Sequence, residues 1–265
     1  MNKVKFTFKE GKRKAMILSF DDGSAEDRRI VSLFNKYGVK GTFHLNSATL
    51  GKPNHIGEEE VRELFFGHEV SCHTLTHPFL ERIPKMEVIH EILEDRKNLE
   101  SLCGYVVRGM SYPFGTYNSE VIELLRELGI NYSRTVHSTL STNLPDNFMK
   151  WDPTCSFKHE KLFSCLESFK GSTRDLSLLF VWGHGYEFDS DEKWEFMERF
   201  LKEASGDEDV WYASCSEIYD YVTACRKAEL SADRSMIYNS SATDIFVKVN
   251  DETVRAASGE TVRLF

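Results

Sequence analysis

Positive charge is scarce in this chain of 265 residues. Lysine and arginine number 33 against 42 aspartates and glutamates, which gives a formal net charge of -9. A nucleic-acid-binding surface normally needs a basic footprint, so this balance argues against nucleic acid as a partner. A neutral polar ligand suits the composition better. Long apolar runs are missing as well, since none approaches the ~18 residues that a membrane span needs, and we expect no membrane association.

Closely spaced cysteines are also lacking, and the first residues show no signal-peptide pattern. The six cysteines are scattered without a CxxC pair, so we expect reduced thiols in a cytoplasmic protein. Residues 1–16, MNKVKFTFKEGKRKAM, hold no apolar core of signal-peptide length. An exported protein whose signal had been removed would look the same, and that alternative stays open.

Apolar runs and helical stripes alternate through most of the chain. Short apolar runs that predict strands lie at residues 14–21, 39–45, 69–72, 105–107, 178–182 and 210–214. Helical spacing predicts helices at residues 24–37, 86–103, 119–128 and 194–201, with a last helix that starts at 218–222. Strands that alternate with helices imply βα units around a parallel sheet, so the predicted fold class is α/β.

The pattern changes after about residue 228. From there the chain alternates with period two around turn residues, which predicts a small β appendage of a hairpin or two. We therefore expect residues 1–227 to form one α/β domain and residues 228–265 to form the appendage. Because the patterning changes at this boundary, the appendage should be dispensable for chemistry.

Two adjacent aspartates end the first predicted strand. Asp21 and Asp22 are followed by Gly23, and like charges at such close range resist joint ionisation. A divalent cation would remove the conflict, because one acid would ligate it while the other accepted protons from its bound water. An Asp-Asp-Gly turn is also common without any ligand, so this motif does not decide the matter alone.

A histidine pair follows the strand predicted at residues 69–72. His73 and His77 are four residues apart, and on a helix this spacing turns both imidazoles to one face, where they can bind one ion. Pro78 would end or bend that turn. The same spacing also arises by chance on solvated helices, so the pair indicates a metal site without proving one.

Two more motifs follow predicted strands. Residues 111–115, Ser-Tyr-Pro-Phe-Gly, form a predicted turn that alone would be read as structural, and His184 lies between two glycines in a position open to ligand. Asp21, His73, Pro113 and His184 all lie just past the carboxyl end of a predicted strand. Barrel and open α/β enzymes build their sites there, so we expect these residues to converge.

Taken in order, the four motifs resemble the polysaccharide deacetylase family, whose shared domain is also called the NodB homology domain or carbohydrate esterase family 4. The resemblance runs from about Lys14 to about Val222, and its most specific part is Asp-Asp-Gly combined with GHEVSCHTLTHP at residues 67–78. It implies a distorted (β/α)7 TIM-like barrel. It also implies a metal-dependent hydrolase that removes N-acetyl groups from an amino-sugar oligo- or polysaccharide, so the expected partner is an N-acetylated carbohydrate.

The resemblance assigns the cofactor and its ligands. Asp22, His73 and His77 match the residues that hold one divalent ion in the family. Zinc is the typical ion, and cobalt, nickel and manganese are alternatives. Three protein ligands leave open positions for water and substrate.

The resemblance also assigns catalytic roles. Asp21 matches the general base and His184 the general acid. The backbone N–H of Phe114 matches an oxyanion donor, and Tyr112 beside it is a further candidate for substrate binding. The roles of Asp21, His184 and Phe114 come from the family, whereas Tyr112 is a candidate because aromatic residues cluster near the ends of the motifs and apolar sugar faces stack on such rings.

Some positions depart from the family pattern. Ser111 stands where an arginine often orients the catalytic aspartate, and the acid that tunes the catalytic histidine is open among Asp152, Glu187 and Asp189. Two other functions also stay open. One is an amidohydrolase of a small N-acyl or cyclic amide, and the other is a carbohydrate-binding module with a vestigial metal site.

Overall fold

The structure is a computed structural model that describes residues 3–265. Residues 1 and 2, which the predicted first domain included, lie outside the described part. The strands are β1 (Val4–Thr7), β2 (Lys14–Asp21), β3 (Gly41–Leu45), β4 (Glu69–Cys72), β5 (Gly109–Ser111), β6 (Tyr132–Arg134), β7 (Cys155–Ser156), β8 (Ser177–His184), β9 (Val210–Tyr212), β10 (Glu229–Leu230), β11 (Met236–Tyr238), β12 (Ile245–Val249), β13 (Glu252–Ala256) and β14 (Thr261–Arg263). The helices are α1 (Asp27–Tyr37), α2 (Val61–Leu64), α3 (Lys85–Cys103), α4 (Ser119–Glu127), α5 (Leu162–Gly171), α6 (Asp191–Ala204) and α7 (Cys215–Lys227).

The main sheet is parallel and curls into a barrel. Its strand order is β6-β5-β4-β3-β2-β8-β7, and β9 pairs with the first half of β2. Trp151, just before β7, pairs with Arg134 of β6, while Cys155 of β7 pairs with Val181 of β8. Residues 151–156 therefore close the ring between β6 and β8. The predicted distorted (β/α)7 barrel is confirmed.

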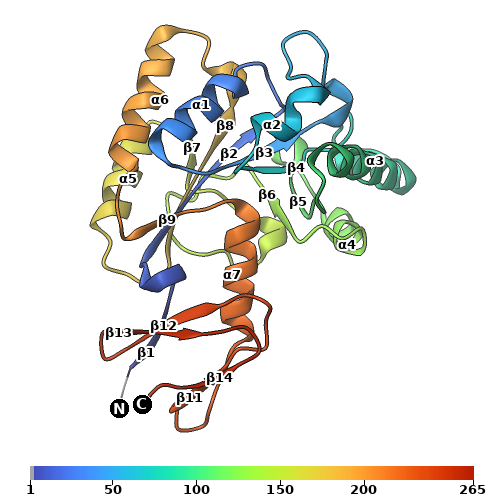
Figure 1. Cartoon of the computed structure of the whole chain (residues 1–265). Coiled ribbons are helices and arrows are strands. Elements are labelled where there is room, and N and C mark those ends of the chain that lie inside the picture. Colours follow the sequence, from blue (N-terminus) through green and yellow to red (C-terminus); the bar gives the residue numbers. More distant parts are fainter. Residues whose placement is uncertain (1–2) are drawn as a thin grey trace.

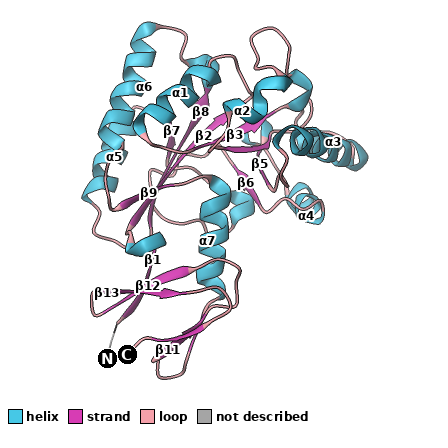
Figure 2. Ribbon diagram, viewed as in Figure 1, coloured by secondary structure: helices cyan, strands magenta, loops and turns pink. Residues whose placement is uncertain are grey.

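Strand β2 contributes side chains to two hydrophobic cores, one on each face of the sheet. Its eight residues are all buried, as expected for a parallel strand covered on both faces. Leu18 and Phe20 belong to the core under the surrounding helices, whereas Ala15 and Ile17 belong to a second core that fills the barrel and its base. Figure 2 shows the helices outside the curled sheet. None of the helices within residues 3–265 combines the length and apolarity needed to cross a membrane.

The C-terminal strands form two small sheets, β1-β12-β13 and β10-β11-β14. Strand β1 pairs antiparallel with β12, Val4 opposite Val249, so the first described strand joins the C-terminal sheet, although the predicted boundary placed it with the barrel. Because β1 leads into the start of β2, this appendage lies at the amino ends of the barrel strands. Figure 1 shows both chain ends there.

Some local predictions were wrong. Residues 105–107 form no strand, and β5 begins only at Gly109. The helix predicted at residues 24–37 starts three residues later than predicted. Helix α1 begins at Asp27, and this side chain is buried against Gly185 instead of turning back to the residue that precedes the helix. Strand β6 and helix α5 were not predicted.

Candidate metal centre and active site

The segment from His73 to His77 is a loop, so the predicted helix is wrong. Strand β4 ends at Cys72, and Thr74 and His77 then adopt left-handed backbone conformations with φ of 69° and 63°. The Thr74 hydroxyl oxygen accepts a hydrogen bond from the His77 N–H at 3.0 Å. The turn nevertheless brings the His73 and His77 rings to 4.7 Å between centroids, so the expected pairing of the two imidazoles is present.

Contacts from distant residues hold this loop. The Asn46 side-chain amide donates to the carbonyl oxygens of His73 and Thr74. The Glu91 carboxylate, on α3, accepts from the Thr76 N–H at 2.8 Å and from its hydroxyl at 2.6 Å. Left-handed backbone outside glycine costs about 1–2 kcal/mol per residue and persists only where its surroundings fix it. Asn46 and Glu91 supply that constraint.

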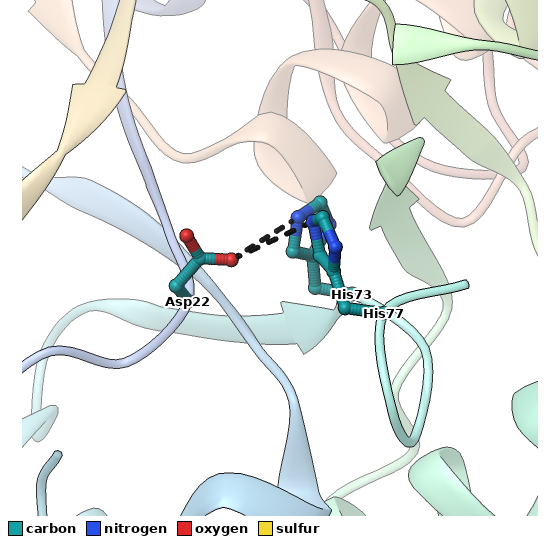
Figure 3. Close-up of side chains that lie close together, drawn as sticks. All are labelled: Asp22, His73 and His77. Atoms are coloured by element: carbon teal, nitrogen blue, oxygen red, sulfur yellow. Dashed lines mark ion pairs between the residues drawn. The ribbon is translucent and has the colours of Figure 1, made fainter. Parts of the chain in front are cut away.

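Asp22 faces both histidines (Figure 3). Its Oδ1 lies 3.4 Å from His73 Nε2 and 3.8 Å from His77 Nε2, and the three ligand atoms lie within 4.8 Å of one another. Within residues 3–265, this buried Oδ1 has no hydrogen-bond partner. His73 Nδ1 lies 2.9 Å from the Ser111 carbonyl oxygen, which leaves Nε2 directed at Asp22. One orphaned carboxylate oxygen and two imidazoles fit a divalent cation such as zinc.

Asp21 lies beside this cluster with its side chain only 3% exposed. The Ser111 hydroxyl donates to its Oδ1 at 3.0 Å, and the guanidinium of Arg134 donates to its Oδ2. Burial would raise the pKa of the Asp21 carboxyl, but the charge of Arg134 and those of nearby histidines outweigh burial and hold the pKa well below its ordinary value. Asp21 is therefore ionised and fixed in orientation. Arg134 was not among the residues predicted from the sequence.

His184 stands next to Asp21 because their strands, β8 and β2, pair these residues in register. Its Nε2 lies 3.9 Å from Asp22 Oδ2, and its Nδ1 lies 2.8 Å from Glu187 Oε1. Burial would lower the pKa of His184, but the hydrogen bond to Glu187 and the charges of Asp21 and Asp22 outweigh it and raise the pKa. This environment favours an imidazolium that can donate a proton from Nε2.

Glu187 is thus the acid beside His184 among the three that the sequence left open. Its Oε1 also lies 2.9 Å from the ammonium of Lys158. Asp152 instead accepts from the hydroxyl of Thr135, and the exposed Asp189 pairs with a lysine on α6. Glu187 reaches its histidine because the chain after β8 makes a 3-10 turn at 185–187.

Tyr112 and Phe114 have different placements. Tyr112 is 1% exposed and its hydroxyl donates to the Met149 carbonyl oxygen at 2.9 Å. The assignment of Tyr112 to substrate binding is therefore wrong, because its side chain points into the core. Phe114 is 49% exposed at the rim, with its ring 4.4 Å from that of His77 and 3.8 Å from that of Phe79. Its backbone role at the oxyanion stays a prediction.

An open cavity of about 480 Å³ leads to the cluster. It reaches Asp22 and His77, and its other lining residues are Ser24, Glu26, Asn46, Thr49, Asn54, His55 and Tyr186. The ring of Tyr186 stacks on that of His184 at 4.9 Å. Most of these lining residues belong to no motif in the sequence, because they come from the loops after β2 and β3. A larger cavity, about 610 Å³, lies between α7 and the appendage.

These features define an α/β barrel protein with a candidate metal centre at the carboxyl ends of its strands. Residues 8–133 match the family model described as polysaccharide deacetylase. The resemblance read from the motifs is confirmed over residues 8–133 by this match and by the relatives named next.

Named relatives cover only part of the chain. A peptidoglycan-N-acetylglucosamine deacetylase from Listeria monocytogenes is 32% identical over 120 residues, which are 44% of this chain and 24% of that protein. A chitooligosaccharide deacetylase from Bradyrhizobium is 28% identical over 120 residues, 44% of this chain and 53% of that protein. The chain thus spans about a quarter to a half of the length of these relatives.

Solved structures with the same fold match a larger share of this chain than these relatives do. A Mycobacterium smegmatis protein assigned by name to the polysaccharide deacetylases matches with a TM-score of 0.65 at 17% identity, over 85% of this chain and 96% of that chain. A pseudoenzyme of carbohydrate esterase family 4 from Bacillus anthracis matches with a TM-score of 0.52 at 17% identity, over 81% of this chain and 68% of that chain. At such identities the likeness shows the fold alone. Since a pseudoenzyme shares that fold, activity must be argued from the site.

Proposed function

We propose that this protein is a metal-dependent hydrolase that removes N-acetyl groups from an amino-sugar oligo- or polysaccharide. One observation carries the proposal. Asp21 and His184, with opposite protonation preferences, flank the Asp22, His73 and His77 cluster at the inner end of an open cavity. Amide hydrolysis needs a base for water and an acid for the leaving amine, and groups whose environments push their pKa values apart are suited to divide these roles.

The proposed chemistry divides among the residues as follows. A divalent ion held by Asp22, His73 and His77 would polarise the acetamide carbonyl and make the attacking water more acidic. Asp21, held ionised and oriented by its two donors, accepts the proton of that water. The backbone N–H of Phe114 donates to the oxyanion, a contribution commonly worth about 3 kcal/mol.

His184 completes the reaction. An amine anion is a poor leaving group, so the sugar nitrogen must be protonated as the carbon–nitrogen bond breaks. The Nδ1 of His184 is engaged by Glu187, which leaves Nε2 to donate that proton. Acetate and a free amino sugar result.

The substrate class draws on the relatives and on the cavity. The two named relatives act on peptidoglycan N-acetylglucosamine and on chitooligosaccharide, as their names state. The cavity here is open and lined mainly by polar side chains, with the Phe114 and Phe79 rings stacked beside His77. Polar groups match sugar hydroxyls, and aromatic faces match the apolar faces of sugar rings.

The test combines metal content with product release. Purified protein should hold about one divalent ion by elemental analysis and should release acetate and free amine from acetylated chito-oligosaccharides. The Asp21→Asn variant should keep the ion, because Asp22 still coordinates, and lose about 10²–10⁴-fold in kcat. The His77→Ala variant should lose tight metal binding. Full metal occupancy in that variant would refute the ligand assignment.

The two other functions predict different results in the same assay. Metal without turnover on any oligosaccharide would indicate a hydrolase of small N-acyl or cyclic amides. Absence of both metal and turnover would indicate a carbohydrate-binding module with a vestigial site. The complete set of three ligands, together with an ionised Asp21, favours an enzyme over the binding module.

A further inference from the structure

Arg134 is a buried arginine inside the barrel. Its side chain has no exposed surface, and it forms an ion pair with Asp21 Oδ2. Its Nη1 donates to the Thr135 carbonyl oxygen at 2.9 Å, and its guanidinium carbon lies 4.4 Å from the centroid of the Trp182 ring. A buried arginine is rare unless it is paired. The partner here is the carboxylate that the proposed function makes the base.

Ser111 approaches the same carboxylate from the neighbouring strand. Strands β5 and β6 are parallel and pair Ser111 with Arg134 in register, so both side chains leave the sheet on the same face. The Ser111 hydroxyl donates to Asp21 Oδ1, and Arg134 donates to Asp21 Oδ2. Ser111 therefore holds one carboxylate oxygen of Asp21, and Arg134 on the adjacent strand holds the other.

We propose that Arg134 is the residue that positions Asp21, and that an arginine at position 111 can position Asp21 in its place. The proposal rests on the function proposed above. A small residue at 111 leaves room for an arginine that reaches across from β6. Serine at 111 also hydrogen-bonds His73 Nδ1 at 2.7 Å, which links the orientation of Asp21 to that of a proposed metal ligand.

Electrostatics gives the reason that an arginine is needed. Asp21 and Asp22 place two carboxylates side by side, and Asp21 is almost fully buried. A buried charge without a partner is strongly unfavourable. The planar guanidinium of Arg134 is held through Nη1 by the Thr135 carbonyl oxygen while Nη2 donates to Asp21 Oδ2. The arginine therefore supplies a donor of fixed direction as well as a charge, which a lysine does only in part.

The first experiment measures kcat and KM in three variants. Arg134→Met should lower kcat by about 100-fold, the loss expected from a misplacement of about 1 Å, while KM and metal content stay near the wild-type values. Arg134→Lys should recover part of kcat. The exchanged variant, Ser111→Arg with Arg134→Ser, should recover more, because an arginine again faces Asp21.

Arg108→Met is the matched control. Arg108 also lies next to β5 and pairs with a carboxylate, that of Asp220 at 2.7 Å, but with its side chain 38% exposed and away from the site. Its loss should leave kcat unchanged. The proposal is overturned if Arg134→Met behaves like this control, or if Arg134→Lys and the exchanged variant are folded and no faster than Arg134→Met.

Thermal unfolding separates this proposal from the proposed function. If the wild-type protein fails to release acetate, the proposed function fails, but the pairing can still be measured. Arg134→Met should lower the Tm, and adding Asp21→Asn should restore part of it, because the unpaired charge is removed. The exchanged variant should restore it as well. If neither change reduces the Tm loss of Arg134→Met, the proposal that Arg134 specifically pairs with Asp21 is refuted.

Discussion

The loop that carries the two histidines depends on Glu91, and this dependence can be measured. Glu91 is 8% exposed and accepts two hydrogen bonds from Thr76. The Glu91→Gln change keeps the helix and the size of the side chain but leaves only one acceptor oxygen. A hydrogen bond to a charged acceptor contributes about 1.5–3 kcal/mol, so about that much should be lost.

This loss is comparable to the strain in the loop. Thr74 and His77 have left-handed backbones, at about 1–2 kcal/mol each. With one anchor removed, the loop should leave its metal-binding conformation for part of the time. Since 1.4 kcal/mol corresponds to a factor of ten, we expect metal affinity to fall about 10- to 100-fold, a range typical of residues that support metal ligands.

The assay is zinc affinity by competition with a chelator, with circular dichroism of the metal-free protein as a check on the fold. Glu94→Gln is the control, because Glu94 lies one turn along the same helix and pairs at 3.2 Å with a lysine whose side chain is 73% exposed. It should bind zinc like the wild type. Affinity in Glu91→Gln within twofold of wild type would show that the loop does not need this anchor.

Three further predictions follow from the site and the appendage. Burial lowers the pKa of His184 and the hydrogen bond to Glu187 raises it, so Glu187→Gln should lower that pKa. Because His184 acts when protonated, the alkaline limb of the pH–kcat profile should then move to lower pH. An alkaline limb that does not move would contradict this role of Glu187. His184→Ala should slow amide cleavage far more than cleavage of an activated aryl ester, whose leaving group needs no proton; equal losses on both substrates would mean that His184 is not the acid. A chain truncated after Lys227 should be less soluble and have a lower Tm. The truncation removes β12, which pairs with β1, and it exposes the buried side chains of Ile218 and Tyr221. A soluble truncated chain with an unchanged Tm would show that the barrel is stable without the appendage.

The sequence predicted the α/β class because its signals are local and strong, and the family resemblance added the barrel. Residues 14–21 are apolar enough to be read as a buried strand, and β2 has these bounds. The convergence of Asp21, His73 and His184 was predicted because parallel strands present their carboxyl ends at one rim, whereas the ligand set of Asp22, His73 and His77 came from the family resemblance. Geometry of this kind follows from the order of strands and needs no knowledge of individual contacts.

What the sequence did not predict depends on contacts between distant residues. Strand β6 has only three residues, too few for a periodic pattern, and an arginine in it reads as a surface residue. Arg134 pairs with Asp21 from 113 positions away. The histidine loop reads as a helix because its spacing fits one, whereas its left-handed residues are fixed by Asn46 and Glu91, which no local pattern connects to it.

The pairing of β1 with β12 also bears on how the protein folds. The two strands pair in register, Val4–Thr7 with Phe246–Val249, although nearly the whole chain lies between them in sequence. Contacts of such long sequence separation form late and slow folding. During synthesis, β1 has to wait as an unpaired edge strand until the final strands are made, while the barrel that begins with β2 can assemble beforehand. Refolding of the full chain is therefore expected to end with the docking of its C-terminal strands onto the first one.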